Sequence, residues 1–376
     1  MSTTGASSNM SRTALVMAGG TGGHIFPGLA VADALRNAGW RVVWLGGRGS
    51  AVNPSMESQL VPPRGYPLEA VDFSGVRGKG FVTLLKMPLR LLRACWQSLG
   101  VLRRVKPNVV VAFGGYISVP AGLMSAVLGK PLIVHEQNSV AGSANKLLAR
   151  FAAKIYTAFP AAFPDSVKQA RWIGNPLRDV FLDKKDPATR YAKRQGPLRI
   201  LVLGGSLGAQ ALNEVVPQAL ALMPLENRPM VMHQSGQKQI DQLRANYSAA
   251  GVQAELTPFI DDTAQAFADA DLVICRAGAS TVTEIAAVGA AAVFVPFPAA
   301  VDDHQTSNAN FLVAQGGGWL VIQQDLTPDR LARMLQKADR PTLMAAAIAA
   351  RKMAKLGATE RIVAACDSLT AKRSKA

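Results

Sequence analysis

Short apolar runs alternate along the chain with segments whose apolar residues recur at helical spacing. The runs predict strands at residues 14–18, 41–45, 109–113, 132–135, 199–203, 272–275 and 292–295. The helical spacing predicts helices at 27–37 and 209–222, and two more that begin after residues 115 and 278. Strands followed by helices in this way are typical of βαβ units and of a mainly parallel sheet.

The pattern occurs twice, once in each half of the chain. Each half has one glycine turn after an early strand and another after a later strand: Gly19–Gly23, Gly114–Gly115, Gly204–Gly208 and Ala277–Gly278. We therefore expect an α/β fold with two Rossmann-like parallel-sheet domains that face each other across a cleft. The link should lie near Gly174–Pro176, where Asn-Pro disfavours a helix. Since ligands of such domains bind at the carboxyl ends of the strands, all four turns should border the cleft.

Composition supports large folded domains. Of the 376 residues, 49% are hydrophobic and 18% charged, which excludes disordered, collagen-like and small disulfide-rich proteins. Cys95, Cys275 and Cys366 lack disulfide or zinc-site spacing and favour a reducing compartment. Residues 1–11 have no apolar core, so we expect a flexible start and not a signal peptide.

Positive charge is concentrated in the first half. The chain has 41 basic and 25 acidic residues, a net charge of +16, which is typical of proteins that bind nucleic acid or anionic membranes. Residues 1–176 contain 19 basic and 6 acidic residues (net +13), whereas residues 177–376 contain 22 and 19 (net +3). The partner that requires this charge should therefore meet the first half.

One basic segment is also strongly apolar. Residues 77–106 contain eight Lys or Arg among bulky aliphatic residues, and no acidic residue occurs from 73 to 135. Nucleic-acid binding usually adds polar and aromatic readers, so this pattern favours an anionic membrane surface and no nucleic acid. The alternative is an ordinary helix with a solvated basic face. The residues predicted to meet the membrane are Phe81, Leu84, Leu85, Arg90 and Arg93.

Residues 108–129 contain no charge and are long enough to span a bilayer. They include Gly114, Gly115 and Pro120, and three consecutive valines follow Asn108. A buried strand, a turn and a helix explain this better than a transmembrane helix.

Several nucleotide and metal motifs are absent or incomplete. Ile25 replaces the third glycine of a dinucleotide motif, and the second strand ends without an acidic residue, which disfavours NAD. Arg48 leaves an NADP site weakly open, and no P-loop motif occurs. Asp269-Ala270-Asp271 resembles a metal-binding D-x-D, but it precedes a strand, so we interpret it as solvated charge at a helix end. Asp302-Asp303-His304 has a metal-like composition, but its place in a proline-flanked loop favours solvation or substrate contact over a metal site. We expect no metal and no cofactor.

Three residues near the predicted turns could carry chemistry. His24 follows the first turn, where a helix is about to begin, and could act as a general base or be structural. Glu136 follows a strand and could orient a hydroxyl or act as a base; alternatively, it forms a surface ion pair with Lys146. Glu284 is placed in the first turn of a helix, where the helix dipole suffices to explain it, although a carboxylate there could also bind ribose hydroxyls.

Six ordered motifs, spread from Ala14 to Cys366, resemble the MurG family of bacterial glycosyltransferases. They are Gly19–Gly28, Gly114–Tyr116, His135–Asn138, Gly174–Arg178, Gly204–Ala209 and Arg276–Glu284. The resemblance implies the GT-B fold and transfer of N-acetylglucosamine to lipid I, giving lipid II for peptidoglycan. It also implies four segments: a flexible 1–11, an acceptor and membrane domain 12–175, a UDP-sugar domain 176–355, and a helix with a basic tail, 356–376, that returns to the first domain.

The resemblance also implies the donor site. Ser206 would lie near the diphosphate, Arg178 near the nucleotide, the Ile260 backbone at uracil and Glu284 on the ribose. Leu207 differs from the glutamine of a relative, which concerns only a side-chain contact. The remaining residues implied to contact UDP-N-acetylglucosamine are Thr21, Gly22, Gly23, Asn138, Ala279, Ser280, Thr281, Val282, Thr283 and Gln305.

The implied reaction is an inverting displacement by the C4 hydroxyl of the N-acetylmuramyl sugar, without a metal. His24 is the preferred base, Glu136 its rival or helper, and Tyr116 positions the acceptor. The protein would act at the cytoplasmic face of the inner membrane as a peripheral protein. Two alternatives remain: a UDP-sugar epimerase of the same fold, and a non-enzymatic protein that binds membrane or RNA.

Overall fold

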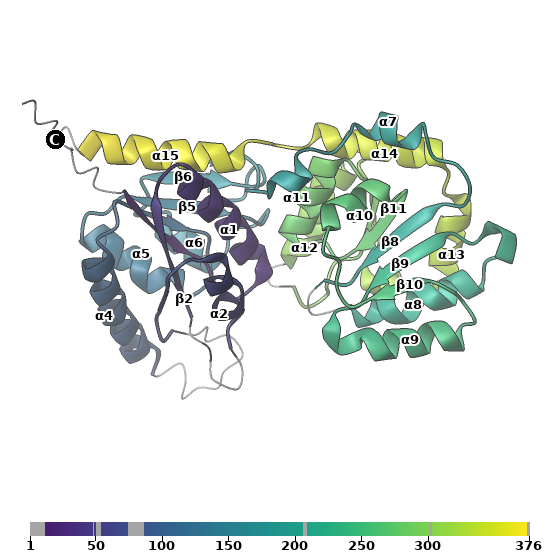
Figure 1. Cartoon of the computed structure of the whole chain (residues 1–376), viewed down its shortest axis with the longest axis horizontal. Coiled ribbons are helices and arrows are strands. Elements are labelled where there is room, and N and C mark those ends of the chain that lie inside the picture. The colour runs from purple at the N-terminus through teal and green to yellow at the C-terminus, as the bar shows by residue number, and fades with distance from the viewer. Residues whose placement is uncertain are drawn as a thin grey trace, which may run out of the picture. The chain divides into compact units, whose positions relative to one another are not determined.

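The computed structural model describes residues 12–47, 49, 54–73, 86–205, 209–300 and 303–373. The chain divides into two compact units (Figure 1). Unit 1 comprises Met1–Gln137, Ala141–Pro176 and Gly357–Ala376, and unit 2 comprises Asn138–Val140 and Leu177–Leu356.

Unit 1 contains a seven-stranded parallel sheet in the order β3-β2-β1-β4-β5-β6-β7. Its strands are β1 (Thr13–Met17), β2 (Arg41–Gly46), β3 (Leu68–Ala70), β4 (Val109–Ala112), β5 (Leu132–Glu136), β6 (Lys154–Thr157) and β7 (Ala170–Trp172). Its helices are α1 (Gly22–Asn37), α2 (Met56–Leu60), η1 (Pro62–Arg64), α4 (Met87–Val105), α5 (Ser118–Val127), α6 (Ser143–Leu148) and α15 (Ala358–Arg373).

Helices cover both faces of this sheet, which explains why its central strands are apolar without alternation. Ala14 and Val16 of β1 pack with α1 and α15 on one face. Leu15 and Met17 pack with α4, α5 and α6 on the other. The last helix, yellow in Figure 1, lies along α1. Asp367 of that helix accepts hydrogen bonds from Arg12 (2.5 Å) and from Trp40 Nε1 (3.2 Å).

Unit 2 has a six-stranded parallel sheet in the order β10-β9-β8-β11-β12-β13. Its strands are β8 (Arg199–Leu203), β9 (Met230–Gln234), β10 (Glu255–Thr257), β11 (Leu272–Cys275), β12 (Ala292–Phe294) and β13 (Trp319–Leu320). Its helices are η2 (Asp179–Phe181), α7 (Pro187–Tyr191), α8 (Gln210–Ala221), η3 (Leu225–Asn227), η4 (Gln237–Gln239), α9 (Ile240–Ala249), α10 (Thr263–Asp269), α11 (Ala279–Val288), α12 (His304–Val313), η6 (Gln323–Asp325), α13 (Pro328–Lys337) and α14 (Arg340–Lys352).

Both sheets have the strand order of Rossmann-type domains, so the prediction of two parallel α/β domains is confirmed. The order reverses between β1 and β4 in unit 1 and between β8 and β11 in unit 2. The four predicted glycine turns follow these four strands. Ligands of open α/β sheets bind at such reversal points, at the carboxyl ends of the strands. The turns therefore identify where each unit should be searched for a site.

One predicted helix boundary is wrong. Helix α1 begins at Gly22 and not near Pro27, which lies inside the helix and is buried. The Thr21 carbonyl accepts the N–H groups of His24 (3.1 Å) and Ile25 (3.2 Å), so the first turn is already helical. Proline often marks the first turn of a helix, which is why the pattern suggested the later start.

Residues 108–129 form β4, a turn and α5, as predicted. Among the residues that the structure describes, no helix is both long and apolar enough to cross a membrane.

Candidate functional site

The two turns of unit 1 at the strand-order reversal are in direct contact. Gly115 has φ +83°, and a Cβ atom there would lie 2.5 Å from the carbonyl oxygen of Gly19. Only glycine satisfies both conditions at this position. The contact brings the start of α1 beside the segment that carries Tyr116, whose side chain is 39% exposed.

His24 and Glu136 belong to one cluster around Gly114. A Cβ atom at Gly114 would lie 3.0 Å from His24 Cδ2 and 3.1 Å from Asn145 Nδ2. Asn145 Nδ2 also donates to Glu136 Oε2 (2.8 Å). His24 Nδ1 lies 3.1 Å from the Thr21 hydroxyl, which orients the imidazole ring. Unit 1 therefore brings Thr21, His24 and Glu136 together.

Glu136 is not a surface residue, so its interpretation as a surface ion pair with Lys146 is wrong. It is the last residue of β5 and is 1% exposed. Besides the Asn145 amide, its Oε2 accepts the backbone N–H of Gly142 (3.1 Å). Asn145 was missed because a helix asparagine nine residues beyond a strand carries no recognisable sequence signal.

Unit 2 presents the start of α11 directly after β11, with Gly278 as N-cap. The first N–H groups of a helix have no partner within the helix and can bind an anion. The Thr283 hydroxyl donates to the carbonyl groups of Ala279 (2.9 Å) and Ser280 (3.0 Å), so it is engaged within the helix. Ser280 Oγ is buried and has no hydrogen-bond partner in the described part of the chain.

Glu284 lies in the second turn of α11 and not in the first, because the helix begins at Ala279. The macrodipole explanation for this glutamate therefore fails, since the effect is confined to the first turn. Burial raises the pKa of Glu284 to about 7, while the positive charge of Arg178 acts in the opposite direction. A partly exposed carboxyl group with a raised pKa is a candidate ligand-binding group.

Two further predicted donor residues of unit 2 are Ile260, in a loop, and Gln305, in the first turn of α12. Ile260 is in the loop between β10 and α10, and its carbonyl accepts the Thr263 hydroxyl at 3.4 Å. Gln305 Oε1 accepts the backbone N–H groups of Ala277 (3.3 Å) and Phe297 (2.9 Å). These bonds engage the side-chain carbonyl oxygen of Gln305 and fix the orientation of its amide group.

The buried side chain of Asn308 is hydrogen-bonded at the turn after β11. Asn308, which the motifs did not single out, donates to the Ala277 carbonyl (3.2 Å) and lies 3.4 Å from the Asn138 side chain. Its Oδ1 accepts the backbone N–H of Ser139 at 2.8 Å. Asn308 thus links the predicted residue Asn138 to the turn after β11.

The D-x-D sequence at 269–271 is not a pair of solvated charges. Asp269 is exposed at the end of α10, but Asp271 is 0% exposed and is bound by Arg194 (2.7 Å) and Arg340 (3.2 Å). A carboxylate enclosed by two guanidinium groups is part of a structural ion-pair network. In the described ranges, no group of three His, Cys, Asp or Glu side chains could hold a metal ion.

The exposed side of α4 is apolar and basic. Leu89, Leu92 and Trp96 are 70%, 62% and 78% exposed at helical spacing i, i+3 and i+7. Arg90 and Arg93, both predicted to meet the membrane, are exposed beside them. Phe81, Leu84, Leu85 and Ser206, which were also predicted, lie outside the described residues, as does residue 207.

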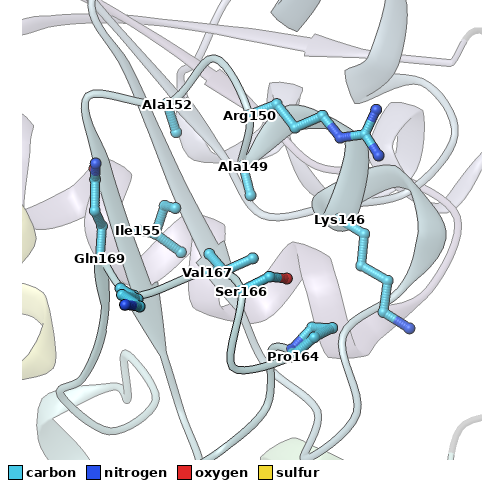
Figure 2. Close-up of a pocket in the computed structure, with 10 residues that line it drawn as sticks. Lys146, Ala149, Arg150, Ala152, Ile155, Pro164, Ser166, Val167 and Gln169 are labelled. Atoms are coloured by element: carbon cyan, nitrogen blue, oxygen red, sulfur yellow. The ribbon is translucent and has the colours of Figure 1, made fainter.

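Two cavities lie away from the predicted catalytic and donor-binding residues. A pocket of about 630 Å³ in unit 1 lies between α6 and the loop before β7, with Ile155 and Val167 near its centre (Figure 2). Lys146 and Arg150 extend from its edge. A pocket of about 730 Å³ in unit 2 includes Arg199 and Met230, which begin β8 and β9. Both pockets lie at amino ends of strands, opposite the turns.

Comparison with known proteins identifies relatives over almost the whole chain. The glycosyltransferase family 28 N-terminal domain matches residues 14–157, and the C-terminal domain of the same family matches residues 199–362. A Polaromonas protein named UDP-N-acetylglucosamine–N-acetylmuramyl-(pentapeptide) pyrophosphoryl-undecaprenol N-acetylglucosamine transferase is 70% identical, over 95% of this chain and 92% of its own. A Cupriavidus pinatubonensis protein of the same name is 58% identical, over 95% and 98%.

Solved structures agree with this similarity. The crystal structure of Acinetobacter baumannii MurG has a TM-score of 0.82 at 38% identity and covers 95% of this chain and 99% of its own. Anabaena HepE, crystallised in complex with UDP, has a TM-score of 0.59 at 16% identity, over 97% and 100%. The second likeness concerns the fold alone.

Proposed function

The chain belongs to glycosyltransferase family 28 and, within it, to the MurG enzymes, and from this premise we infer that it transfers N-acetylglucosamine from UDP-N-acetylglucosamine to lipid I. The product is lipid II, the precursor of peptidoglycan. The observation that carries this conclusion is the 70% identity over 95% of the chain to a transferase of that name. The fold is the GT-B fold, with two parallel-sheet domains.

We propose that unit 2 binds the donor at the carboxyl ends of β8, β10 and β11. The free N–H groups at the start of α11 and the buried Ser280 hydroxyl are suited to the diphosphate. Glu284 accepts the ribose hydroxyls, with Arg178 near the nucleotide and Ile260 at uracil. The Gln305 amide donates to the sugar. The remaining contacts proposed on the donor are Thr21, Gly22, Gly23, Asn138, Ser206, Ala279, Thr281, Val282 and Thr283.

We propose an inverting displacement in unit 1's cluster. The C4 hydroxyl oxygen of the acceptor sugar bonds to the anomeric carbon as the bond from that carbon to the diphosphate oxygen breaks. His24 takes the hydroxyl proton, and UDP leaves with the bonding electron pair. Backbone N–H groups at α11 stabilise the charge that develops on the diphosphate. Tyr116 positions the acceptor, and Glu136 orients the cluster through Asn145.

The function is tested by UDP release with and without a lipid I analogue, in the presence of EDTA. Release that requires the acceptor and resists EDTA is expected. Donor consumption without acceptor would instead indicate an epimerase, and binding without UDP release would indicate a non-enzymatic protein.

The role proposed for Glu284 predicts a pH-dependent donor affinity. Vicinal hydroxyls donate best to the ionised carboxylate, and burial raises the pKa of Glu284 to about 7. Affinity for UDP-N-acetylglucosamine should therefore rise with pH, roughly tenfold from about pH 6 to about pH 8. Calorimetric titration across this range measures the effect. This donor suits the test because its diphosphate has no terminal phosphate that titrates near neutral pH.

Matched variants separate Glu284 from other titrating groups. Glu284→Gln should bind weakly with a flat pH profile. Glu255→Gln, which changes an exposed glutamate of the same unit, should keep the wild-type slope. A slope that survives in Glu284→Gln would remove this residue from the donor site.

We propose peripheral binding of unit 1 to the cytoplasmic face of the inner membrane through the exposed face of α4. Apolar side chains would insert among lipids while Arg90 and Arg93 meet anionic headgroups. Changing Leu89, Leu92 and Trp96 to Ser should abolish most flotation with vesicles that contain anionic phospholipid. Because these side chains are 62–78% exposed, the free energy of unfolding should change little. Undiminished flotation at unchanged stability would remove α4 from the membrane contact.

A further inference from the structure

A buried carboxylate lies at the first glycine turn of unit 1. Glu57 of α2 is 3% exposed, although the first 176 residues contain only 6 acidic residues. Its Oε1 accepts the backbone N–H of Gly20 and the backbone N–H of Gly47, each at 3.3 Å. One carboxylate oxygen therefore joins the turn after β1 to the turn after β2.

These two turns are where a Rossmann-type domain normally meets the anionic part of its ligand. Backbone N–H groups of the turn after the first strand bind phosphate oxygens, and the end of the second strand lies beside them. In unit 1 the Gly20 N–H already points to a carboxylate oxygen of the protein itself. A phosphate brought to the same N–H would meet a buried negative charge.

The glutamate is held firmly in this position. Ser55 donates to the Gly47 carbonyl (2.6 Å) and caps α2 by accepting the N–H of Ser58 (3.1 Å). A Cβ atom at Gly19 would overlap Glu57 Oε1. The glycine at position 19 therefore leaves space for the carboxylate, and the carboxylate fixes Gly20, the residue before Thr21.

We propose that Glu57 is a positioning residue that replaces a ligand phosphate at the first turn of unit 1. It holds the turn in the conformation from which Thr21 and His24 project, and it keeps phosphate groups away from the N–H groups of Gly20 and Gly47. This inference rests on the proposed transfer reaction for its kinetic consequences, but not for its consequences in anion binding.

The test compares Glu57→Gln, Glu57→Asp and Glu57→Ala in the full-length protein. Glutamine can keep Oε1 on both N–H groups, so kcat should remain within about threefold of wild type. Alanine releases the turn, and kcat should fall about 100-fold, since a misplacement near 1 Å can cost that much. KM for UDP-N-acetylglucosamine should rise by less than kcat falls, because only Thr21, Gly22 and Gly23 of this turn are proposed on the donor, and its other proposed contacts lie in unit 2. Aspartate is too short to reach the N–H groups of Gly20 and Gly47, so the kcat of Glu57→Asp should be below that of Glu57→Gln.

Binding of inorganic phosphate provides a second measurement, which would not change if Glu57 only stabilised the fold. In Glu57→Ala the two N–H groups become free, so phosphate should bind to this variant and inhibit it, but not wild type or Glu57→Gln. Binding is followed by ³¹P NMR, which needs no activity. The matched control is Gln59→Ala, which removes an exposed side chain from the same short helix.

The outcomes are separable. Wild-type kcat in Glu57→Ala, or equal phosphate binding by all variants, would overturn the inference. If Glu57→Ala does not fold, the kcat values of Glu57→Gln and Glu57→Asp decide. A kcat for Glu57→Asp equal to or above that of Glu57→Gln would contradict the inference. If wild type and Gln59→Ala both fail to transfer sugar, the proposed function fails, while phosphate binding still tests Glu57.

Discussion

Replacing His24 with alanine is expected to lower the rate of transfer to lipid I by about 10²- to 10⁴-fold, the usual contribution of a general base. Its ring is oriented through Nδ1, which lies 3.1 Å from the Thr21 hydroxyl. When Nδ1–H donates to that hydroxyl, Nε2 carries the lone pair that accepts a proton. Initial rates at saturating donor measure the loss, and added imidazole should restore part of it.

The contrast with Glu136 makes this prediction discriminating. Glu136 is 1% exposed, and its Oε2 already accepts hydrogen bonds from Asn145 and Gly142. We expect Glu136→Gln to cost less than His24→Ala and to show no imidazole rescue, because it disturbs orientation and not proton transfer. Thr21→Val should cost about tenfold, since it removes the orienting partner of the ring. If Glu136→Gln lost more activity than His24→Ala, the two roles would have to be exchanged.

The strands and the turns that follow them were predictable from the sequence, because their residue patterns recur along the chain. The apolar runs located the central strands because both faces of each sheet are buried, as Ala14 and Leu15 illustrate by packing on opposite faces. The glycine turns could be located because a close contact such as that of Gly115 with Gly19 tolerates no side chain. Periodicity thus sufficed for the fold and for the strand ends where a site should lie.

Contacts between distant segments were not predictable in the same way. Asp271 looks like a solvated charge in sequence because its partners, Arg194 and Arg340, lie 77 and 69 residues away. Glu57 went unnoticed because its ligands are backbone N–H groups, which leave no side-chain pattern. Its only sequence signal is rarity, as one of six acidic residues in the first 176.

The same reasoning leads to a large expected effect on stability at Asp271. Its Oδ1 binds Arg194 Nη1 at 2.7 Å, and its Oδ2 accepts from Arg340 Nη2 (3.2 Å) and from the backbone N–H of Arg199 (2.8 Å). The Asp271 side chain is 0% exposed, and those of Arg194 and Arg340 are 10% and 22% exposed. Removing the carboxylate leaves two poorly solvated guanidinium groups without their counter-charge.

We expect Asp271→Ala to lower the free energy of unfolding by about 3–5 kcal/mol, the usual cost of breaking a buried ion pair. For a unit of this size the midpoint of thermal unfolding should fall by roughly 6–20 °C. Asp269→Asn is the matched control, two residues away and exposed, and it should change stability by less than about 0.5 kcal/mol. Differential scanning calorimetry with and without Mn²⁺ distinguishes the structural role from a metal site. A metal-binding D-x-D would make both variants lose an Mn²⁺-dependent stabilisation, whereas the ion-pair network makes only Asp271→Ala unstable, with or without the ion.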